Sequence, residues 1–416
     1  MHLRPSEPAV ASTSLVSPGP ARVMVVQYAG DYLEAHRRLE ETGTETYYGH
    51  RYVLEHLARI GRTYGEVAVL CCKSPRPYEA KLPSGVIVVG AGEHRDAQRR
   101  AVMDRIAAFH PTHLIVLGPL PRVVRWGLRN GCRVMCLFAD SFEVGLLRRL
   151  LRHGRLAALL NNPRVDLVAN HGVGACVSLA RIGVRRDKIL PWDWVHLRRP
   201  SDAQPKTDPD PSRPSLLFVG SVIARKGIGD AVAALAALRR RGVPAVLKVA
   251  GAGEVERYRL LARQLGAQEA VEFLGLVPND AVFRLMREAT AVVVPSQHAY
   301  PEGLPLTIYE SLCARTPVIA SDHPMFVRRL MHRTSAMIYP AGDADALATC
   351  VEELLAEPGL YSAISAASQE TWEGLQIPAK WGEILFRWIG DGDADRSWLR
   401  QHRLDAGLYA AQLGAS

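Results

Sequence analysis

Two glutamates stand in a segment that joins an apolar strand pattern to a helix pattern. Glu302 falls in the loop and Glu310 two helical turns further on, so that each carboxylate can hold hydroxyl groups by charge-assisted hydrogen bonds. Pro305 suits the first helical turn, which leaves Gly303 and Leu304 to present amide N–H groups at the positive end of a helix dipole. This loop is therefore predicted to seat a pyrophosphate and polyol groups, as found together in a nucleotide sugar.

A second loop carries two adjacent cations. Gly220 and Ser221 follow the strand pattern at residues 215–219, and Arg225 and Lys226 come before the next helix. Two cations in this position can neutralise a diphosphate and stabilise the charge of a leaving group. The alternative is an ordinary charge pair at the entry to a helix.

A third loop follows the strand pattern at residues 271–274. Backbone groups of Gly275, Leu276 and Val277 would be exposed there and could bond to the edge of a nucleobase. Each of the three loops is a weak pattern alone, and it is their order and spacing together that indicate a donor site.

Short apolar, β-branched runs that alternate with helix patterns must position these loops. Strands of this kind, separated by helices, indicate a parallel sheet covered on both faces. Two such series occur, which predicts an α/β protein of two doubly wound, Rossmann-like domains that face each other across a ligand-binding cleft. The expected strands are residues 23–26, 67–70, 86–89, 114–117, 134–137 and 167–169, followed by 215–219, 245–250, 271–274, 291–294 and 317–320.

Proline marks the expected domain boundary. Residues 200–214 contain five prolines, which neither a helix nor a central strand accommodates. The predicted divisions are a disordered tail at 1–20, an N-terminal acceptor-side domain at 21–200, a linker at 201–214, a C-terminal nucleotide-sugar-binding domain at 215–375, and a helical segment at 376–416 that packs back on the N-terminal domain.

Composition narrows the classes of protein. A chain of 416 residues, 48% hydrophobic and 22% charged, is neither a small binding module nor globally disordered. The net charge of +9 is concentrated in residues 1–205, where 29 Lys and Arg meet 18 Asp and Glu, a net charge of +11. An anionic, pyrophosphate-linked acceptor or a lipid surface explains that excess better than a nucleic acid.

Cysteine usage and hydropathy bear on the compartment. Seven cysteines without a zinc or redox spacing predict buried thiols in a cytoplasmic chain. We find neither the apolar core of a signal peptide nor an apolar run of roughly 18 residues that could span a membrane.

The segment from Val144 to Leu160 has an amphipathic pattern. Its apolar residues point largely one way, and Arg148, Arg149, Arg152 and Arg155 largely another. This pattern predicts peripheral contact with anionic lipid at the inner face of the membrane. The alternative is a domain helix with a solvated basic face.

From about Leu216 to Glu357 the chain resembles the family-4 retaining glycosyltransferases of the GT-B fold, also described as glycosyl transferases group 1. The residues that carry the resemblance are Gly220 with Arg225-Lys226-Gly227, Ala250-Gly251-Ala252-Gly253, Phe273-Leu274-Gly275, Pro295-Ser296, the pair Glu302 and Glu310, and Thr316-Pro317-Val318-Ile319-Ala320-Ser321-Asp322.

The resemblance implies roles for individual residues. Lys226 and a neighbouring arginine would bind the donor diphosphate, Glu302 would lie by the donor sugar, and Glu310 would hold the ribose. Ser221 stands where the family has an arginine, which leaves Arg225 to supply the second cation. The donor site would be completed by Gly220, Gly303, Leu304 and Pro305, with Gly275, Leu276 and Val277 as the nucleobase wall.

The acceptor side departs further from the family pattern. The chain reads Tyr28-Ala29-Gly30-Asp31 in place of a Gly-Gly loop, and Pro191-Trp192-Asp193-Trp194 in place of Pro-Asn-Gly. Gly30, Asp31 and His171 are the acceptor-side candidates, and Asp140 stands near where relatives place a histidine that faces the acceptor. Asp140 could equally cap a helix, and His171 could be a hydrogen-bonded loop histidine.

The sequence thus predicts a retaining hexosyltransferase that moves a sugar from a nucleoside diphosphate sugar to a glycan or lipid-linked acceptor, in cell-surface polysaccharide or glycoconjugate synthesis. In this family the leaving phosphate takes the acceptor proton, so that neither a metal nor another cofactor is expected. One alternative is a nucleotide-sugar epimerase on the same fold, although its loops would need a paired acid and histidine. The other is a non-catalytic regulator that binds nucleic acid through the basic half.

Overall fold

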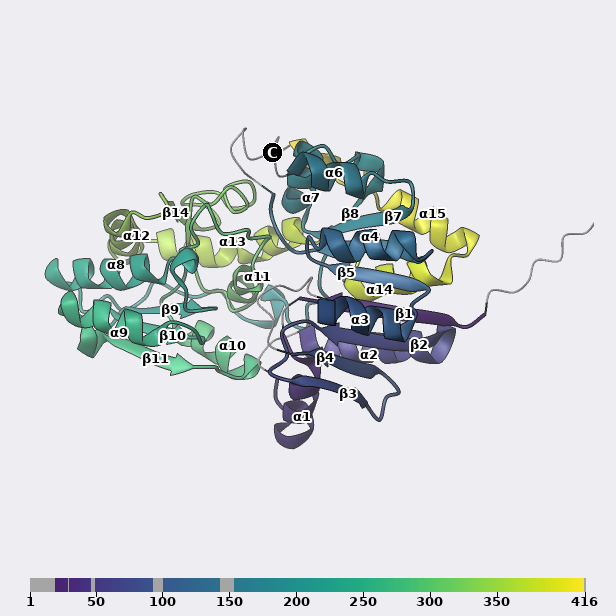
Figure 1. The fold of residues 1–416 in the computed structure, drawn as a ribbon. Helices are drawn as coiled ribbons and strands as arrows, with labels where there is room; N and C mark the ends of the chain where they lie inside the picture. Colours follow the sequence, from purple (N-terminus) through teal and green to yellow (C-terminus); the bar gives the residue numbers. More distant parts are fainter. Residues whose placement is uncertain (1–18, 29, 46–48, 93–99, 143–152, 415–416) are drawn as a thin grey trace, which may run out of the picture.

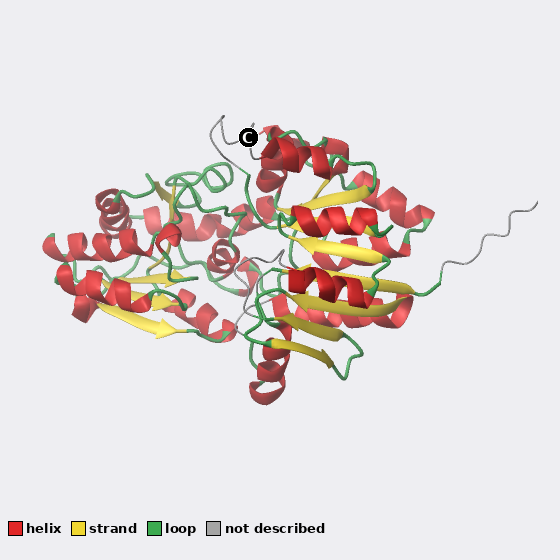
Figure 2. Cartoon of the chain, viewed as in Figure 1, coloured by secondary structure: helices red, strands yellow, loops and turns green. Residues whose placement is uncertain are grey.

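The computed structural model describes residues 19–28, 30–45, 49–92, 100–142 and 153–414. They form two lobes, each built around one sheet (Figure 1). Helices lie on the outside of the yellow strands in both lobes (Figure 2). The expected α/β class with two parallel-sheet domains is confirmed.

The N-terminal sheet has eight strands in the order β3-β4-β2-β1-β5-β6-β7-β8, all parallel except that β3 runs antiparallel to β4. Helices cover both faces of this sheet, and the middle residues of its central strands β1, β5 and β6 are accordingly apolar. The strands are β1 (Ala21–Gln27), β2 (Gly65–Cys71), β3 (Pro77–Lys81), β4 (Ile87–Ala91), β5 (His113–Leu117), β6 (Arg133–Phe138), β7 (Val165–His171) and β8 (Ile189–Trp192). The helices of this part are α1 (Tyr32–Thr42), α2 (Gly49–Tyr64), α3 (Arg100–Phe109), α4 (Pro121–Arg129), α6 (Gly154–Leu160) and α7 (Val173–Arg181).

The C-terminal sheet has six parallel strands in the order β11-β10-β9-β12-β13-β14. In both sheets the strand order reverses beside the first strand, and ligands of doubly wound proteins bind at that point. The strands are β9 (Ser215–Val219), β10 (Val246–Ala250), β11 (Val271–Gly275), β12 (Ala291–Val294), β13 (Val318–Ser321) and β14 (Met337–Tyr339). The helices are α8 (Ile228–Arg240), α9 (Val255–Gln264), α10 (Asn279–Glu288), α11 (Leu306–Cys313), α12 (Ala344–Ala356) and α13 (Leu360–Leu375).

The chain crosses between the lobes twice. After β8 it enters the C-terminal lobe, and after α13 it returns, so that α14 (Trp381–Gly390) and α15 (Asp393–Gln401) lie beside the N-terminal sheet (Figure 1). Trp381, Trp388 and Leu399 belong to the same buried apolar cluster as the N-terminal strands. A last short helix, α16 (Ala410–Gly414), follows.

Hydrogen bonds hold the proline-rich stretch between the lobes against the C-terminal lobe. The Lys206 ammonium donates to the carbonyl of Ala289 at 2.8 Å, and Asp208 accepts from the amides of Gly359 and Ser362 at the start of α13. These contacts fix residues 206–208 to the C-terminal lobe, so that this part of the linker packs along that lobe.

Two general features complete the fold. All seven cysteines are buried and none forms a disulfide. Within the described residues, no helix is long and apolar enough to cross a membrane. Of the segment from Val144 to Leu160, residues 144–152 lie outside the described part, as do residues 1–18 of the predicted tail.

Candidate active site

A cleft of about 600 Å³ lies between the two lobes. Its walls are the carboxyl ends of strands from both sheets and the loop before α11, as predicted for two domains that face each other across a cleft. The predicted site residues that line it are Gly30, His171, Gly220, Ser221, Lys226, Glu302, Gly303, Leu304, Pro305 and Glu310.

Glu302 lies in the loop before α11, residues 295–305, which we call the donor loop because the sequence predicts a donor site there, and it is only 6% exposed. Its Oε1 accepts a hydrogen bond from the Ser296 hydroxyl at 2.7 Å and forms an ion pair with the Lys226 ammonium. A carboxylate this deeply buried needs such partners, because burial without them is strongly unfavourable. One of the two acids and one of the two cations that the sequence singled out, Glu302 and Lys226, are therefore joined directly.

Tyr300 organises the two cations. Its ring centre lies 4.6 Å from Lys226 Nζ and 5.6 Å from Arg225 Cζ, within the range of cation–π attraction. Lys226 lines the cleft, whereas Arg225 is an exposed residue outside its lining. The ring thus holds one cation in the cleft and the other beside it.

The loop that carries these cations touches the donor loop through Gly227. Its φ of 73° lies in the left-handed region, and a Cβ atom built on it would stand 1.8 Å from the carbonyl oxygen of Pro295. Only glycine permits both the conformation and the approach. This contact brings Lys226 within reach of Glu302.

Helix α11 places the second glutamate. It begins at Leu306, with Pro305 as the preceding cap residue, so that Gly303 and Leu304 lie directly before its positive end. Glu310 lies about one helical turn beyond the start of α11, near Arg198 and hydrogen-bonded to the Asn279 side chain. Burial raises the pKa of Glu310 to about 7, against the lowering effect of these two neighbours.

The N-terminal wall is uncharged. It is formed mainly by residues at the ends of β1, β5, β6, β7 and β8, and among the described residues of this wall we find no Lys, Arg, Asp or Glu. Burial, with a contribution from Arg38, lowers the pKa of His50 to about 4, so that this imidazole is neutral near pH 7. The main side chains of the wall are Gln27, Tyr28, Tyr32, His50, Leu117, Phe138, His171, Trp192, Trp194 and Trp381.

This wall bears on the expected anionic acceptor, which stays a prediction. The +11 charge of residues 1–205 was explained in part by an anionic acceptor, yet the described wall of the cleft on this side holds none of that charge. Exposed arginines lie elsewhere, as on α4 (Arg122, Arg125, Arg129) and α6 (Arg155). The basic surface and the wall of the cleft are separate features of the lobe.

Some predicted site residues lie outside the cleft lining. Asp31 caps α1, accepting from the amides of Leu33 and Glu34 and from the Tyr78 hydroxyl at 2.5 Å, so that its carboxylate is already engaged. Asp140 lies beside the cleft residue Ala139, and burial together with the charge of Glu302 raises its pKa to about 6.

The predicted nucleobase wall is also outside the lining. Gly275 ends β11, the edge strand of its sheet, and Leu276 is 61% exposed. Val277 packs against an apolar cluster of the C-terminal lobe. Of this region, Asn279 reaches the cleft, because it begins α10 two residues further on.

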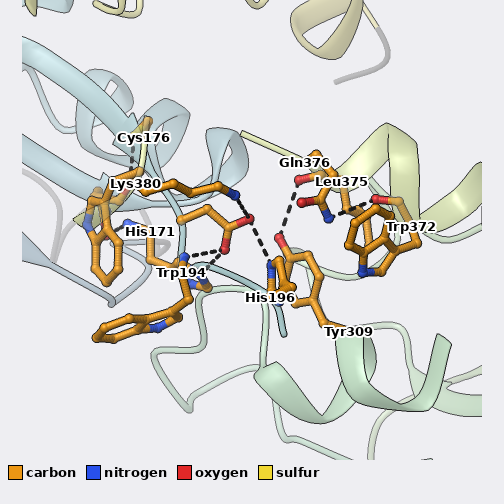
Figure 3. Close-up of polar contacts among 12 residues, drawn as sticks. His171, Cys176, Trp194, His196, Tyr309, Trp372, Leu375, Gln376 and Lys380 are labelled. Atoms are coloured by element: carbon orange, nitrogen blue, oxygen red, sulfur yellow. Dashed lines mark hydrogen bonds and ion pairs between the residues drawn. The ribbon is translucent and has the colours of Figure 1, made fainter. Parts of the chain in front are cut away.

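His171 is held by a buried carboxylate that the sequence analysis did not assign. The imidazole Nε2 lies 3.1 Å from Asp193 Oδ1, and Asp193 is fully buried. The other oxygen, Oδ2, lies 3.1 Å from His196 Nε2 and 3.4 Å from Lys380 Nζ (Figure 3). Burial alone would raise the pKa of Asp193, but the bonds from His171 and His196 outweigh it and lower the pKa.

Sequence reasoning missed Tyr300, Asn279, Asp193 and the aromatic wall as functional elements. A carboxylate between two tryptophans, Trp192-Asp193-Trp194, at the end of an apolar strand was an available indication for Asp193. Tyr300 and Asn279 had no such indication, since their roles depend on contacts between separate loops. Within the described residues, no group of three or more His, Cys, Asp or Glu side chains could hold a metal ion.

Comparisons with known proteins relate part of the chain to glycosyltransferases. Residues 201–371 match the family described as "Glycosyl transferases group 1". The amylovoran biosynthesis glycosyltransferase AmsK of Erwinia amylovora is 29% identical over 143 residues, which are 33% of this chain and 35% of that protein. A GDP-mannose-dependent alpha-(1-6)-phosphatidylinositol monomannoside mannosyltransferase of Mycobacterium tuberculosis is 29% identical over 182 residues, 42% of this chain and 47% of that protein. The chain thus spans between a third and a half of the length of these relatives.

The fold comparison reaches further along the chain. Sucrose-phosphate synthase from Thermosynechococcus elongatus superimposes with a TM-score of 0.63 at 18% identity, over 95% of this chain and 99% of that one. The match includes both lobes, which confirms the expected GT-B fold.

Proposed function

We propose that this chain, whose residues 201–371 match the glycosyl transferases group 1, is a retaining, metal-independent hexosyltransferase that uses a nucleoside diphosphate sugar. The observation that carries the proposal is the Glu302–Lys226 ion pair in the cleft, directly before the positive end of α11. A carboxylate, a cation and free backbone amides at one point suit a sugar joined to a diphosphate.

The donor diphosphate would lie against Lys226 and the amides of Gly303 and Leu304. Because Lys226 is paired with Glu302, a bound diphosphate would share the ammonium and leave Glu302 free to bond sugar hydroxyls. Arg225, held beside the cleft by Tyr300, would supply the second positive charge. The Glu310 carboxylate would accept hydrogen bonds from the ribose hydroxyls.

In the transfer step the bond between the anomeric carbon and the diphosphate oxygen breaks. The bond from the acceptor oxygen to that carbon forms on the same face, and the acceptor proton passes to the departing phosphate oxygen. Lys226 and the helix terminus stabilise the charge that develops on the phosphate, and the cleft walls hold the two substrates in contact.

The part of the acceptor that enters the cleft would be uncharged and hydroxyl-bearing. The N-terminal wall supports this, since its described side chains are apolar, aromatic or neutral. Gln27 lines it with a buried Oε1 that lacks a hydrogen-bond partner within the described residues, and a hydroxyl group would satisfy that oxygen. A glycan, or the sugar of a lipid-linked glycan, has this chemistry.

The names of two relatives support a biological setting for this proposal. One acts in amylovoran biosynthesis, and another is a phosphatidylinositol monomannoside mannosyltransferase. We infer a role in cell-surface polysaccharide or glycoconjugate synthesis. Exposed arginines on α4 and α6 would allow peripheral contact of the N-terminal lobe with an anionic membrane.

The test is a panel of nucleoside diphosphate sugars, scored by thermal shift and by release of nucleoside diphosphate. We expect one donor to raise the melting temperature and to be turned over, and both responses to fall in Glu310→Ala and Lys226→Ala. If no donor stabilises the wild-type chain, the proposed function is wrong. Turnover that survives a chelator, with the anomeric configuration of the product read by NMR, would test the metal-independent and retaining parts separately.

A further inference from the structure

Asp193 lies where the two crossings between the lobes meet. Its amide donates to the carbonyl of Ala379, and its own carbonyl accepts from the amide of Trp381, at 3.0 and 3.1 Å. The side chain therefore stands between the end of β8 and the start of α14, with no exposed surface. Burying an ionised carboxylate there costs free energy, and the backbone hydrogen bonds that join the two segments do not require a carboxylate side chain.

Both carboxylate oxygens of Asp193 are used. Oδ1 accepts from the amide of Trp194 at 2.7 Å and lies against His171 Nε2, while Oδ2 lies against His196 Nε2 and the Lys380 ammonium. Figure 3 shows His171, His196 and Lys380 approaching from three different segments. Because an ionised carboxylate only accepts hydrogen bonds, each imidazole must carry a hydrogen on the nitrogen that faces it.

The two histidines face different environments on their other sides. The His196 ring stacks on Tyr309 of α11, with ring centres 4.5 Å apart. His171 lines the cleft, and its Nδ1 would lie 3.5 Å from a Cβ atom built on Gly303. That atom would also lie 3.0 Å from the carbonyl oxygen of Ala139, so the donor loop presses closely on the N-terminal lobe at this point.

We propose that Asp193 is a positioning residue, which keeps a hydrogen on His171 Nε2 and so leaves Nδ1 to face the donor loop and the sugar bound there. The effect of Asp193 on sugar transfer rests on the proposed function. The position of the hydrogen on His171 does not depend on that function. Trp192, whose indole N–H is bonded to the carbonyl of Phe138, holds the other side of the imidazole at 4.9 Å between ring centres. The ring is thereby fixed in both orientation and tautomer.

The first experiment needs no activity. The ¹⁵N shifts of His171, assigned with a His171→Gln variant, report which ring nitrogen carries the hydrogen. We expect it on Nε2 in the wild type. In Asp193→Asn the side-chain amide must donate to one of the two imidazoles, so that one of them moves its hydrogen to Nδ1. A wild-type His171 with hydrogen on Nδ1 alone would overturn the proposal, whether or not the chain transfers sugar.

The second experiment separates positioning from stability. We expect Asp193→Ala, which removes the acceptor from both imidazoles, to lower kcat by about 10- to 100-fold with a change in donor KM of less than about 3-fold. In a His171→Phe background the same change should lower kcat by less than about 2-fold, because its effect passes through the imidazole. Effects that multiply in the double variant would overturn the proposal.

Two matched variants serve as controls. Asp166, on the same strand as His171, accepts from Arg133 Nε and Trp388 Nε1 at 2.9 and 3.1 Å but lies at the opposite end of β7. Asp166→Asn should leave kcat within about 2-fold of the wild type. Lys380→Met removes the ammonium and keeps the carboxylate, so that His171 should retain its Nε2 hydrogen. If wild-type turnover is absent altogether, the proposed function fails, and the NMR result still decides the role of Asp193.

Discussion

The two walls of the cleft differ in charge and in the kind of side chain that forms them. The C-terminal wall concentrates charge, with Lys226 and Glu302 paired before the positive end of α11. The N-terminal wall is uncharged in its described part and is built from aromatic and apolar side chains. A diphosphate needs fixed positive charge, whereas a neutral sugar needs shape and a few hydrogen bonds. Under the proposed function, this difference assigns the diphosphate to the C-terminal wall and the neutral sugar of the acceptor to the N-terminal wall.

The walls also differ in how far the sequence predicts them. The C-terminal wall, or charged wall, consists of short loops that are each continuous in sequence. Residues such as Lys226 and Glu302 could therefore be identified by their spacing. The N-terminal wall, or neutral wall, brings together the ends of five strands that are far apart in sequence. Gln27, Leu117 and Trp192, for example, come from three of these strands. Its composition is set by the sheet topology, and no local pattern contains it.

The largest expected effect is at the charged wall. Glu302→Gln keeps the size of the side chain but removes the charge that Lys226 pairs with. We expect kcat to fall about 100- to 1,000-fold, because sugar hydroxyls lose a charged acceptor in the transition state, while donor KM changes much less. Steady-state kinetics with the preferred donor test this. A fall confined to KM would assign Glu302 to ground-state binding only.

Glu310 should make the charged wall sensitive to pH. Its pKa of about 7 lies above its usual value, so the stability gained by keeping it protonated is present at low pH and lost as the pH rises through 7. Glu310→Gln, which mimics the protonated form, should therefore melt about 2–4 °C above the wild type at pH 8 and with it at pH 4.5. Thermal melts at the two pH values measure this. The same offset at both values would contradict the assignment.

Tyr300 offers a smaller perturbation of the same wall. Tyr300→Ala removes the ring between Arg225 and Lys226, and we expect donor KM to rise about 3- to 10-fold. Tyr300→Phe keeps the ring and should behave as the wild type. If the two variants are equally impaired, the hydroxyl group rather than the ring is what matters.

The smallest effect on chemistry is expected at the basic surface. Arg125→Gln with Arg129→Gln on α4 should change kcat/KM for a soluble acceptor by less than about 2-fold, since both residues lie outside the cleft lining. Binding to anionic vesicles should weaken about 10- to 30-fold. Exposed arginines of the other lobe, in Arg240→Gln with Arg263→Gln, are the matched control for co-sedimentation. Unchanged pelleting of the α4 variant would exclude this surface as a membrane contact.

The fold was more predictable than the neutral wall, and its exceptions have physical reasons. Continuous apolar runs identified the central parallel strands. The strands that were missed lie at sheet edges: β3 pairs antiparallel and carries charged residues, β8 contains Pro191, and β14 has three residues. Short or polar edge strands lack the pattern of a strand buried on both faces.

The contrast between the walls is tested most directly by titration calorimetry with UDP and GDP. We predict that the wild-type chain binds one of them, that Lys226→Ala weakens this binding at least about 10-fold, and that Tyr28→Phe on the opposite wall leaves it within about 2-fold. Equal losses in both variants, or none in Lys226→Ala, would contradict the assignment of the donor to the C-terminal wall.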